Sequence, residues 1–171
     1  LADGIVGPVT YKALEKYILG YTYYRIEPND TLTSIAEKNH STVNLILSAN
    51  PNINPNNLIP NTVITVPFNY NVVMDDINYT YKAMWYNIMG LIQRYPFLEA
   101  SSIGKSVLGN DLFLIKFGDG PKKIHINASH HALEWITSVF VMKFIESISN
   151  AYINNEDIDG YNIENIFNTH T

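Results

Sequence analysis

Apolar and polar positions along the first half of the chain predict two short strands and two short helices. Residues 22–26 and 62–66 are rich in Thr, Tyr, Val and Ile, which favour β-structure. Between them, residues 31–38 and 42–49 place apolar side chains at helical spacing. Two strands of this length need helices packed against them to be stable. The order strand, helix, helix, strand therefore predicts a small βααβ module.

Capping and turn residues mark the limits of these elements. Asp30 or Thr31 is suited to cap the first helix, and Ser41 the second, because a side-chain oxygen there can accept a hydrogen bond from the first helical turn. Asparagine and proline crowd residues 50–61 and 67–71, a composition typical of turns and connections. The second of these clusters predicts the end of the module.

The second half of the chain predicts longer helices and a hairpin. Residues 81–95 have apolar positions at helical spacing, and residues 102–118 predict two strands joined by a Gly-Asn-Asp turn. Residues 123–127 predict a third strand. The helix expected next, residues 132–150, is apolar on most of its circumference and should be buried on several sides. With a further helical stretch near residues 163–167, these elements predict an α/β domain with a mixed sheet that is incomplete.

Composition and charge restrict the function classes. The 171 residues are 46% hydrophobic and 16% charged, as in globular proteins, and suffice for one ordinary domain or two small ones. A net charge of −5 without a basic run argues against nucleic acid and against an anionic membrane surface as partners. No apolar run is long enough to predict a membrane-spanning helix. The absence of cysteine excludes disulfides and thiolate metal sites but leaves the compartment open.

One short stretch carries a candidate metal-binding pattern. His131 and Glu134 are three positions apart, between the predicted strand and the predicted helix, so both side chains can point to one spot. Imidazole nitrogen and carboxylate oxygen are both zinc ligands. His130 is less suitable because a leucine occupies its matching position, and His125 lies within the predicted strand, where a structural role is expected. The pattern by itself leaves open an alternative, a glutamate at a helix start beside a histidine in a polar loop.

The flanking sequence resembles the zinc carboxypeptidase family of metallopeptidases, of the carboxypeptidase A type. That family has, in this order and at about this spacing, a helix ending in Tyr-Pro, a hairpin with glycine and serine, and a strand leading into H-x-x-E-W-I. The matching residues are Tyr95, Pro96, Gly104, Ser106, Gly109, Leu112, His131, Glu134, Trp135 and Ile136. The resemblance covers residues 79–171 and implies that His131 and Glu134 are zinc ligands.

The smaller module resembles the LysM family, whose members bind glycans containing N-acetylglucosamine, such as peptidoglycan or chitin. The match covers residues 23–67 and includes Asn-Asp-Thr-Leu at residues 29–32 and the closing Val-Pro. It implies a sugar groove between the loop after the first strand and the loop before the second. The glycan-binding residues expected from it are Asn29, Asp30, Thr31, Leu32, Pro51, Asn52, Ile53, Asn56, Asn57 and Leu58. For any one of them, a structural role as cap or turn residue is an equal alternative.

The N-terminal residues suggest a third unit. Residues 2–14 resemble the end of a peptidoglycan-binding helical repeat, with the pattern D-G-x-x-G-x-x-T, and a turn followed by one helix is the alternative. We expect the end of this repeat at residues 1–20, the LysM module at 22–68, a linker at 69–78, and the N-terminal part of a zinc carboxypeptidase-like domain at 79–171.

The two main resemblances together imply an enzyme of the bacterial cell wall. Zinc carboxypeptidase relatives that carry LysM modules resemble γ-D-glutamyl-diaminopimelate peptidases, which cut the stem peptide between D-glutamate and diaminopimelate. In such enzymes zinc polarises the scissile carbonyl, a glutamate acts as base and an arginine stabilises the oxyanion. The expected partners are peptidoglycan strands and stem peptides. The expected location is extracellular or at the cell wall, with the spore or mother-cell compartment as a further option.

The family's catalytic machinery is incomplete within the chain. A catalytic zinc needs three protein ligands, and the family's third, a histidine, follows H-x-x-E much later than His170. The base and the arginines are likewise expected after Thr171. We therefore expect this chain alone to bind zinc weakly and to lack peptidase activity, unless a second chain completes the domain. The alternatives are a non-catalytic peptidoglycan-binding protein with a degenerate peptidase domain and, disfavoured by the peptidase part, a LysM protein directed at chitin.

Overall fold

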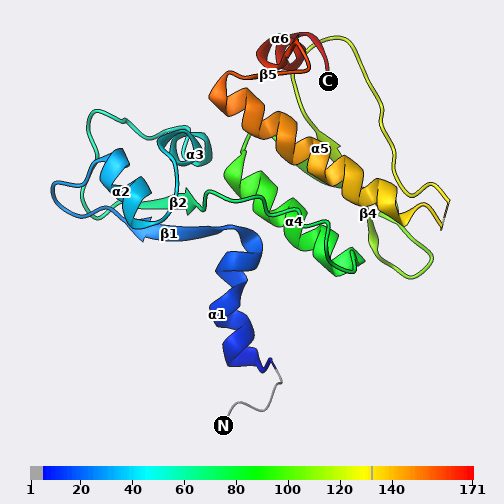
Figure 1. Ribbon diagram of the computed structural model, residues 1–171, viewed down its shortest axis with the longest axis horizontal. Helices are drawn as coiled ribbons and strands as arrows, with labels where there is room; N and C mark the ends of the chain where they lie inside the picture. The colour runs from blue at the N-terminus through cyan, green and yellow to red at the C-terminus, as the bar shows by residue number, and fades with distance from the viewer. Residues whose placement is uncertain (1–5, 132) are drawn as a thin grey trace.

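The computed structural model describes residues 6–131 and 133–171, which form helices and small antiparallel sheets. The elements are α1 (Pro8–Leu19), β1 (Tyr21–Arg25), α2 (Leu32–Lys38), α3 (Val43–Ala49), β2 (Val63–Pro67), α4 (Tyr81–Arg94), β3 (Glu99–Lys105), β4 (Asp111–Lys116), α5 (Trp135–Asn154), β5 (Asp157–Ile158), β6 (Tyr161–Asn162) and α6 (Ile163–Thr169). Figure 1 shows β1, β2 and α2 gathered at one end, α4 and α5 side by side, and α1 projecting from the junction. The predicted α/β class, a βααβ module followed by an incomplete α/β part, is confirmed.

The βααβ module has its own core beneath a two-stranded sheet. β1 and β2 pair antiparallel, from Tyr21 opposite Pro67 to Arg25 opposite Val63. The helices cover this ribbon, which would be only marginally stable alone. The buried core residues are Ile26, Leu32, Ile35, Ala36, Ile46, Ile64 and Val66. The ribbon contributes Ile64 and Val66 of β2 to this core, together with Ile26 just after β1, whereas β1 itself has no buried residue.

Threonines cap both helices of the module. Thr31 accepts a hydrogen bond from the backbone N–H of Ser34, in agreement with one of the two predicted caps. The prediction that Ser41 caps the next helix is wrong, because the cap is Thr42, whose Oγ1 accepts a hydrogen bond from the N–H of Leu45. The helix begins at Val43, one position later than expected, so only Thr42 lies within reach of its first turn.

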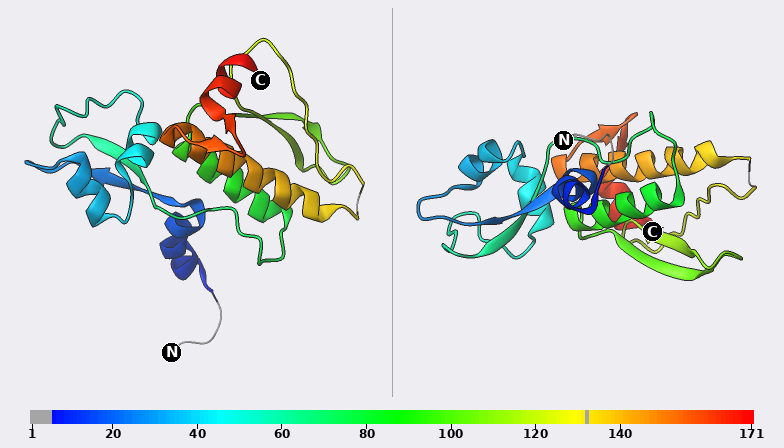
Figure 2. Two further views of the ribbon diagram at one scale, coloured as in Figure 1. Left: turned by 45° about the horizontal axis from the view of Figure 1, so that its top comes forward. Right: turned by 90° about the horizontal axis from the view of Figure 1, so that it is seen from below.

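The second part of the structure packs a hairpin against two long helices. β3 and β4 pair antiparallel with a register shift between Ser102 and Gly104. Figure 2 shows this hairpin on one side of the α4–α5 pair. The core beneath it contains Val72, Val73, Ile88, Leu91, Tyr95, Leu98 and Met142, with Phe113 and Ile115 of the hairpin packed against them. The predicted helix and hairpin of this part are therefore confirmed.

The predicted third strand does not form. Residues 123–127 are exposed and outside any named strand, with Ile124 and Ile126 more than half exposed. A parallel pairing starts just before them, where Lys122 bridges His170 and the N–H of Thr171 donates to the carbonyl of Lys122 at 2.7 Å. A strand needs a neighbouring edge along its whole length, and the described residues offer this one only a short C-terminal segment. The described residues therefore form no mixed sheet: their three sheets are two-stranded and antiparallel, and the parallel pairing is an isolated bridge.

The long helix α5 is buried on fewer sides than predicted. It runs from Trp135 to Asn154, and the expected start at Ala132 lies outside the described residues. Val139 and Met142 are buried, but four large side chains of the same helix are 41–71% exposed. They are Trp135, Ile136, Phe140 and Phe144. The other helices and the hairpin cover only part of the circumference of α5. The described residues therefore bury only some of its apolar side chains.

The predicted linker is packed between the two parts. Val72 and Val73 are 5% and 3% exposed, and their backbone N–H groups donate to the carboxylate of Glu146 at 2.8 and 3.0 Å. Arg94, 3% exposed, donates from Nη1 to the carbonyl of Phe68 at 3.0 Å. The stretch from Phe68 to Val73 is therefore anchored at two points by α4 and α5, and the βααβ module is fixed relative to these helices.

Candidate functional site

The two predicted metal ligands face each other in the turn that precedes α5. Nδ1 of His131 lies 2.9 Å from Oε1 of Glu134, and the N–H of His131 donates to Oε2 at 3.2 Å. Their side chains are 74% and 47% exposed, so both are accessible from solvent. The hydrogen bond from the His131 side chain, followed by the one from its backbone, lowers the pKa of Glu134 below its usual value. An ionised carboxylate beside an imidazole is suited to a divalent cation.

Hydroxyl groups hold this turn in place. Ser129 has a φ of 52°, and its N–H donates to Oγ1 of Thr137 at 2.7 Å. Oγ1 of Thr137 in turn donates to the carbonyl of Glu134 at 2.7 Å. The ring of His130 stacks edge-on against that of His131, with centroids 4.9 Å apart. Sequence reasoning missed Ser129 and Thr137 as supporting residues, although their hydroxyls flank the H-x-x-E pattern.

The pair fits part of a zinc site. Two ligand atoms on one tetrahedral zinc lie about 3.3 Å apart, given bonds of about 2 Å, and Nδ1 of His131 and Oε1 of Glu134 are already near this separation. Among residues 6–131 and 133–171, no group of three or more His, Cys, Asp or Glu side chains is arranged to hold a metal ion. The chain therefore brings together two candidate ligands in suitable geometry, and His125 remains an exposed residue apart from them.

The two predicted glycan-binding loops lie at the same end of the βααβ module. Arg25 pairs with Val63, and the N–H of Ile26 donates to the carbonyl of Thr62 at 2.9 Å. The loop that leaves β1 and the loop that enters β2 are therefore neighbours, at the end of the module remote from α5 (Figures 1 and 2). Six of the predicted residues are exposed. They are Asn29, Thr31, Pro51, Asn52, Asn56 and Asn57, and of these Pro51 lies at the α3 end of its loop, beside Tyr152 of α5.

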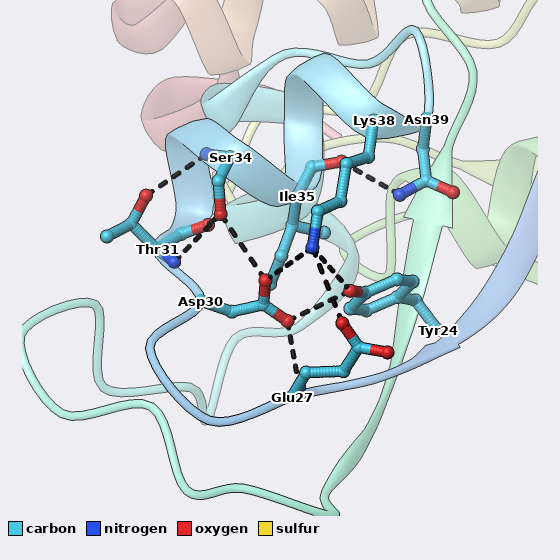
Figure 3. Close-up of polar contacts among 8 residues, drawn as sticks. All are labelled: Tyr24, Glu27, Asp30, Thr31, Ser34, Ile35, Lys38 and Asn39. Carbon is cyan, nitrogen blue, oxygen red and sulfur yellow. Dashed lines mark hydrogen bonds and ion pairs between the residues drawn. The ribbon is translucent and has the colours of Figure 1, made fainter.

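The Asp30 side chain is bonded to neighbouring residues of the protein and does not face the solvent (Figure 3). Its side chain is only 4% exposed, and its carboxylate accepts hydrogen bonds from Tyr24 Oη at 2.9 Å and from the N–H of Glu27 at 2.8 Å. Nζ of Lys38 lies 2.9 Å from Oδ1. The hydrogen bond from Lys38 is the main reason that the pKa of Asp30 falls to about 2, and burial raises the pKa of Tyr24. This network fixes the loop after β1.

The predicted glycan-binding residues thus have different surroundings. Leu32 is buried, and Ile53 and Leu58 pack against the same core. Asp30 and Thr31 use their side-chain oxygens for the loop and for the α2 cap. The asparagines of the set are all exposed, so their amides are accessible from solvent. Asn29 has a φ of 71° and lies in the turn after β1. A sugar approaching this end would meet chiefly amide groups.

Comparisons with known proteins agree with this two-part architecture. Residues 24–67 match the LysM domain, and residues 84–163 match the zinc carboxypeptidase domain. The chain is 39% identical over 94 residues to gamma-D-glutamyl-L-diamino acid endopeptidase 1 of Lysinibacillus sphaericus. The aligned stretch covers 55% of this chain and 24% of that protein. It is also 33% identical over 93 residues to the uncharacterized protein YqgT of Bacillus subtilis (strain 168), and this alignment covers 53% of this chain and 25% of that protein. No solved structure matches the chain significantly.

These matches cover the two parts of the chain separately. The chain contains a LysM domain followed by part of a zinc carboxypeptidase domain, as its resemblances predicted. The matched region spans about a quarter of the length of each of these two relatives. His131 and Glu134 lie inside the zinc carboxypeptidase match, and all the predicted glycan-binding residues lie inside the LysM match. Among the described helices, none combines the length and apolar character needed to cross a membrane.

Proposed function

We propose that this chain forms part of a zinc-dependent peptidase that cuts the γ-D-glutamyl-diaminopimelate bond of peptidoglycan stem peptides. In this proposal the LysM domain keeps the enzyme on the wall polymer, at the cell surface. The contact of 2.9 Å between His131 and Glu134, within the zinc carboxypeptidase match, is the observation that carries it. The similarity to a protein named as a gamma-D-glutamyl-L-diamino acid endopeptidase supports this choice of bond.

The residues of the chain have distinct roles in the proposed site. Nδ1 of His131 and the carboxylate of Glu134 would provide two zinc ligands, and the position of Glu134 at the start of α5 stabilises its negative charge. When bound, zinc would supply a Lewis acid for the scissile carbonyl and an acidified water. The third ligand and the base would come from outside the described residues, in a continuation of the domain or in a second chain. Thr137 and Ser129 would keep the two ligands oriented.

The LysM domain would act by local concentration. Exposed asparagine amides in the loops after β1 and before β2 can donate to and accept from sugar hydroxyl and acetamido groups. Binding there would keep stem peptides near the peptidase part without adding contacts to the scissile bond. Asp30 would contribute indirectly, by fixing the loop through Tyr24 and Lys38.

A second candidate is a peptidoglycan-binding protein whose peptidase part is not catalytic. In this candidate the LysM loops bind the wall polymer, and the His131–Glu134 pair takes part in no hydrolysis. The two candidates separate when zinc-loaded protein with a complete peptidase domain is incubated with purified muropeptides and the products are identified by mass. Our proposal expects a product that begins at diaminopimelate, made by wild type and His125→Ala but not by His131→Ala. Binding to peptidoglycan without any hydrolysis would favour the non-catalytic candidate instead.

A further inference from the structure

A groove runs between the LysM domain and the peptidase part, away from the His131–Glu134 pair. It encloses about 500 Å³, within the range of ordinary ligand sites, and is open to solvent. Asn44, Ser48 and Pro51 line it from the LysM side. Pro96, Phe97 and Tyr152 line it from the other side. Because both domains contribute walls, neither would form the groove alone.

The two walls are held in a fixed relationship. Oγ of Ser48 donates to the carbonyl of Arg94 at 3.0 Å, and the amide of Asn44 donates to Oδ1 of Asn154 at 2.8 Å. Leu45, on the same helix, is 3% exposed in the core that contains Leu91 of α4. The groove is therefore preformed, so a ligand would not have to order its walls on binding.

The chemistry of the lining favours a neutral carbohydrate. The rings of Phe97 and Tyr152 lie edge to face with centroids 4.8 Å apart, and Phe167 stacks on Tyr152 at 4.4 Å, so the aromatic wall of the groove is rigid. The apolar CH face of a pyranose can pack against the half-buried part of this wall that lines the groove. The exposed amide of Asn44 can bind hydroxyl or acetamido groups. None of the residues lining the groove carries a formal charge, which disfavours a charged peptide as the occupant.

The groove is also continuous with the predicted glycan-binding loop. Pro51 lines the groove and begins the segment Pro51, Asn52, Ile53. A glycan strand lying on the loops could thus extend past Pro51 toward Tyr152 without leaving the surface.

We propose that this groove binds the sugar units of a glycan strand that extend beyond the LysM loops toward the peptidase part. The proposal rests on the proposed glycan binding by LysM. In this arrangement the LysM domain and the peptidase part share one extended binding surface, and the strand reaches the peptidase part in a set direction. The preferred ligand is then a long oligosaccharide, since a short one fills only the loops.

Calorimetric titration of the 171-residue chain with the tetramer and the octamer of N-acetylglucosamine tests this inference. Wild type should bind the octamer about tenfold more tightly than the tetramer, the gain expected from a few added contacts. Asn44→Trp places a bulky ring in the groove and should keep the tetramer affinity while losing most of the octamer gain. Asn69→Trp introduces the same ring at an exposed position outside the groove and should behave as wild type.

The possible outcomes separate the two proposals. If wild type binds neither oligomer, glycan binding by LysM is wrong and the groove proposal is wrong with it. If wild type binds both but Asn44→Trp retains the full octamer gain, only the groove proposal is overturned. Amide resonances provide a second measurement that needs no variant. Those of Tyr152 and Ile153 should shift with the octamer and not with the tetramer, and unchanged resonances with both would contradict the proposal.

Discussion

The carboxylate of Glu146 accepts a hydrogen bond from the backbone N–H of Val72 at 2.8 Å, across 74 positions of sequence. Both groups are buried, and the second carboxylate oxygen accepts the N–H of Val73. A long-range contact of this kind turns the segment between the two domains into part of the core. The orientation of the LysM domain relative to α5 is therefore built into the fold.

Glu146→Ala should destabilise the protein markedly. The change leaves two buried N–H groups without their acceptor, a loss of about 2–5 kcal/mol in the free energy of unfolding. Urea denaturation measures this directly. Glu156→Ala, which removes an exposed glutamate just after the same helix, should change the free energy by less than about 0.5 kcal/mol. Equal stability of the two variants would show that the Glu146 contacts do not hold the segment.

Asp30→Asn should weaken the LysM domain through its ion pair with Lys38. The pKa of Asp30 is lowered to about 2, so the ionised carboxylate stabilises the folded state. Since Lys38 is half exposed, we expect a loss of only about 1–2 kcal/mol at neutral pH. The matched control is Glu27→Gln, whose carboxylate lies 3.5 Å from the same Lys38 but is 67% exposed, and it should have almost no effect.

The same pair predicts a pH dependence. The pKa of Asp30 in the folded state lies below the unfolded value of about 3.9, so its contribution is present above pH 4 and is lost as the pH falls toward 2. The difference in unfolding free energy between wild type and Asp30→Asn should shrink over that interval. A difference that stays constant from pH 6 to pH 2 would rule out this role for the carboxylate.

Gly90 allows a close approach between α1 and α4. A Cβ atom at this position would lie 2.4 Å from the backbone carbonyl oxygen of Leu19. Gly90→Ala should therefore force the helices apart and cost about 1–3 kcal/mol, despite the better helix propensity of alanine. Thermal unfolding followed by circular dichroism provides the readout. Gln93→Ala, at an exposed position of α4, should leave the transition almost unchanged, and a similar result for Gly90→Ala would contradict the packing.

The sequence predicted those elements that depend on local patterns. Both strands of the module, the capping of α2 by Thr31 and the hairpin of β3 and β4 follow from spacing, side-chain type and turn residues. The face-to-face arrangement of His131 and Glu134 also follows, because their three-residue spacing lies within one turn. Such features need few residues distant in sequence, so a linear pattern suffices to define them.

Features that depend on distant partners were not predicted. The segment 123–127 has the composition of a strand, but strand formation requires an edge that the described residues provide only as far as Ile124, whose N–H donates to the carbonyl of Thr171. The apolar pattern of α5 gave no indication that Phe140 would be 71% exposed. The anchoring of Val72 by Glu146 was also missed. A glutamate next to Phe144 and Ile145 of this helix was an available signal, since a buried carboxylate requires donors.

The 171-residue chain should not bind zinc tightly. Two ligands give far less than the binding free energy of about 10–16 kcal/mol that complete structural zinc sites provide. Calorimetric titration with zinc should show weak binding that Glu134→Gln reduces further. Tight binding of one zinc per chain would mean that the described residues contain a third ligand after all, contrary to the arrangement seen here.

The most direct test of the account is the zinc content of the protein with a complete peptidase domain. Wild type and His125→Ala should each retain one zinc per chain after dialysis, and His131→Ala should lose it, because Nδ1 of His131 is one of its proposed ligands. Elemental analysis of the three purified proteins gives the answer. Full zinc occupancy in His131→Ala would contradict the proposed metal centre.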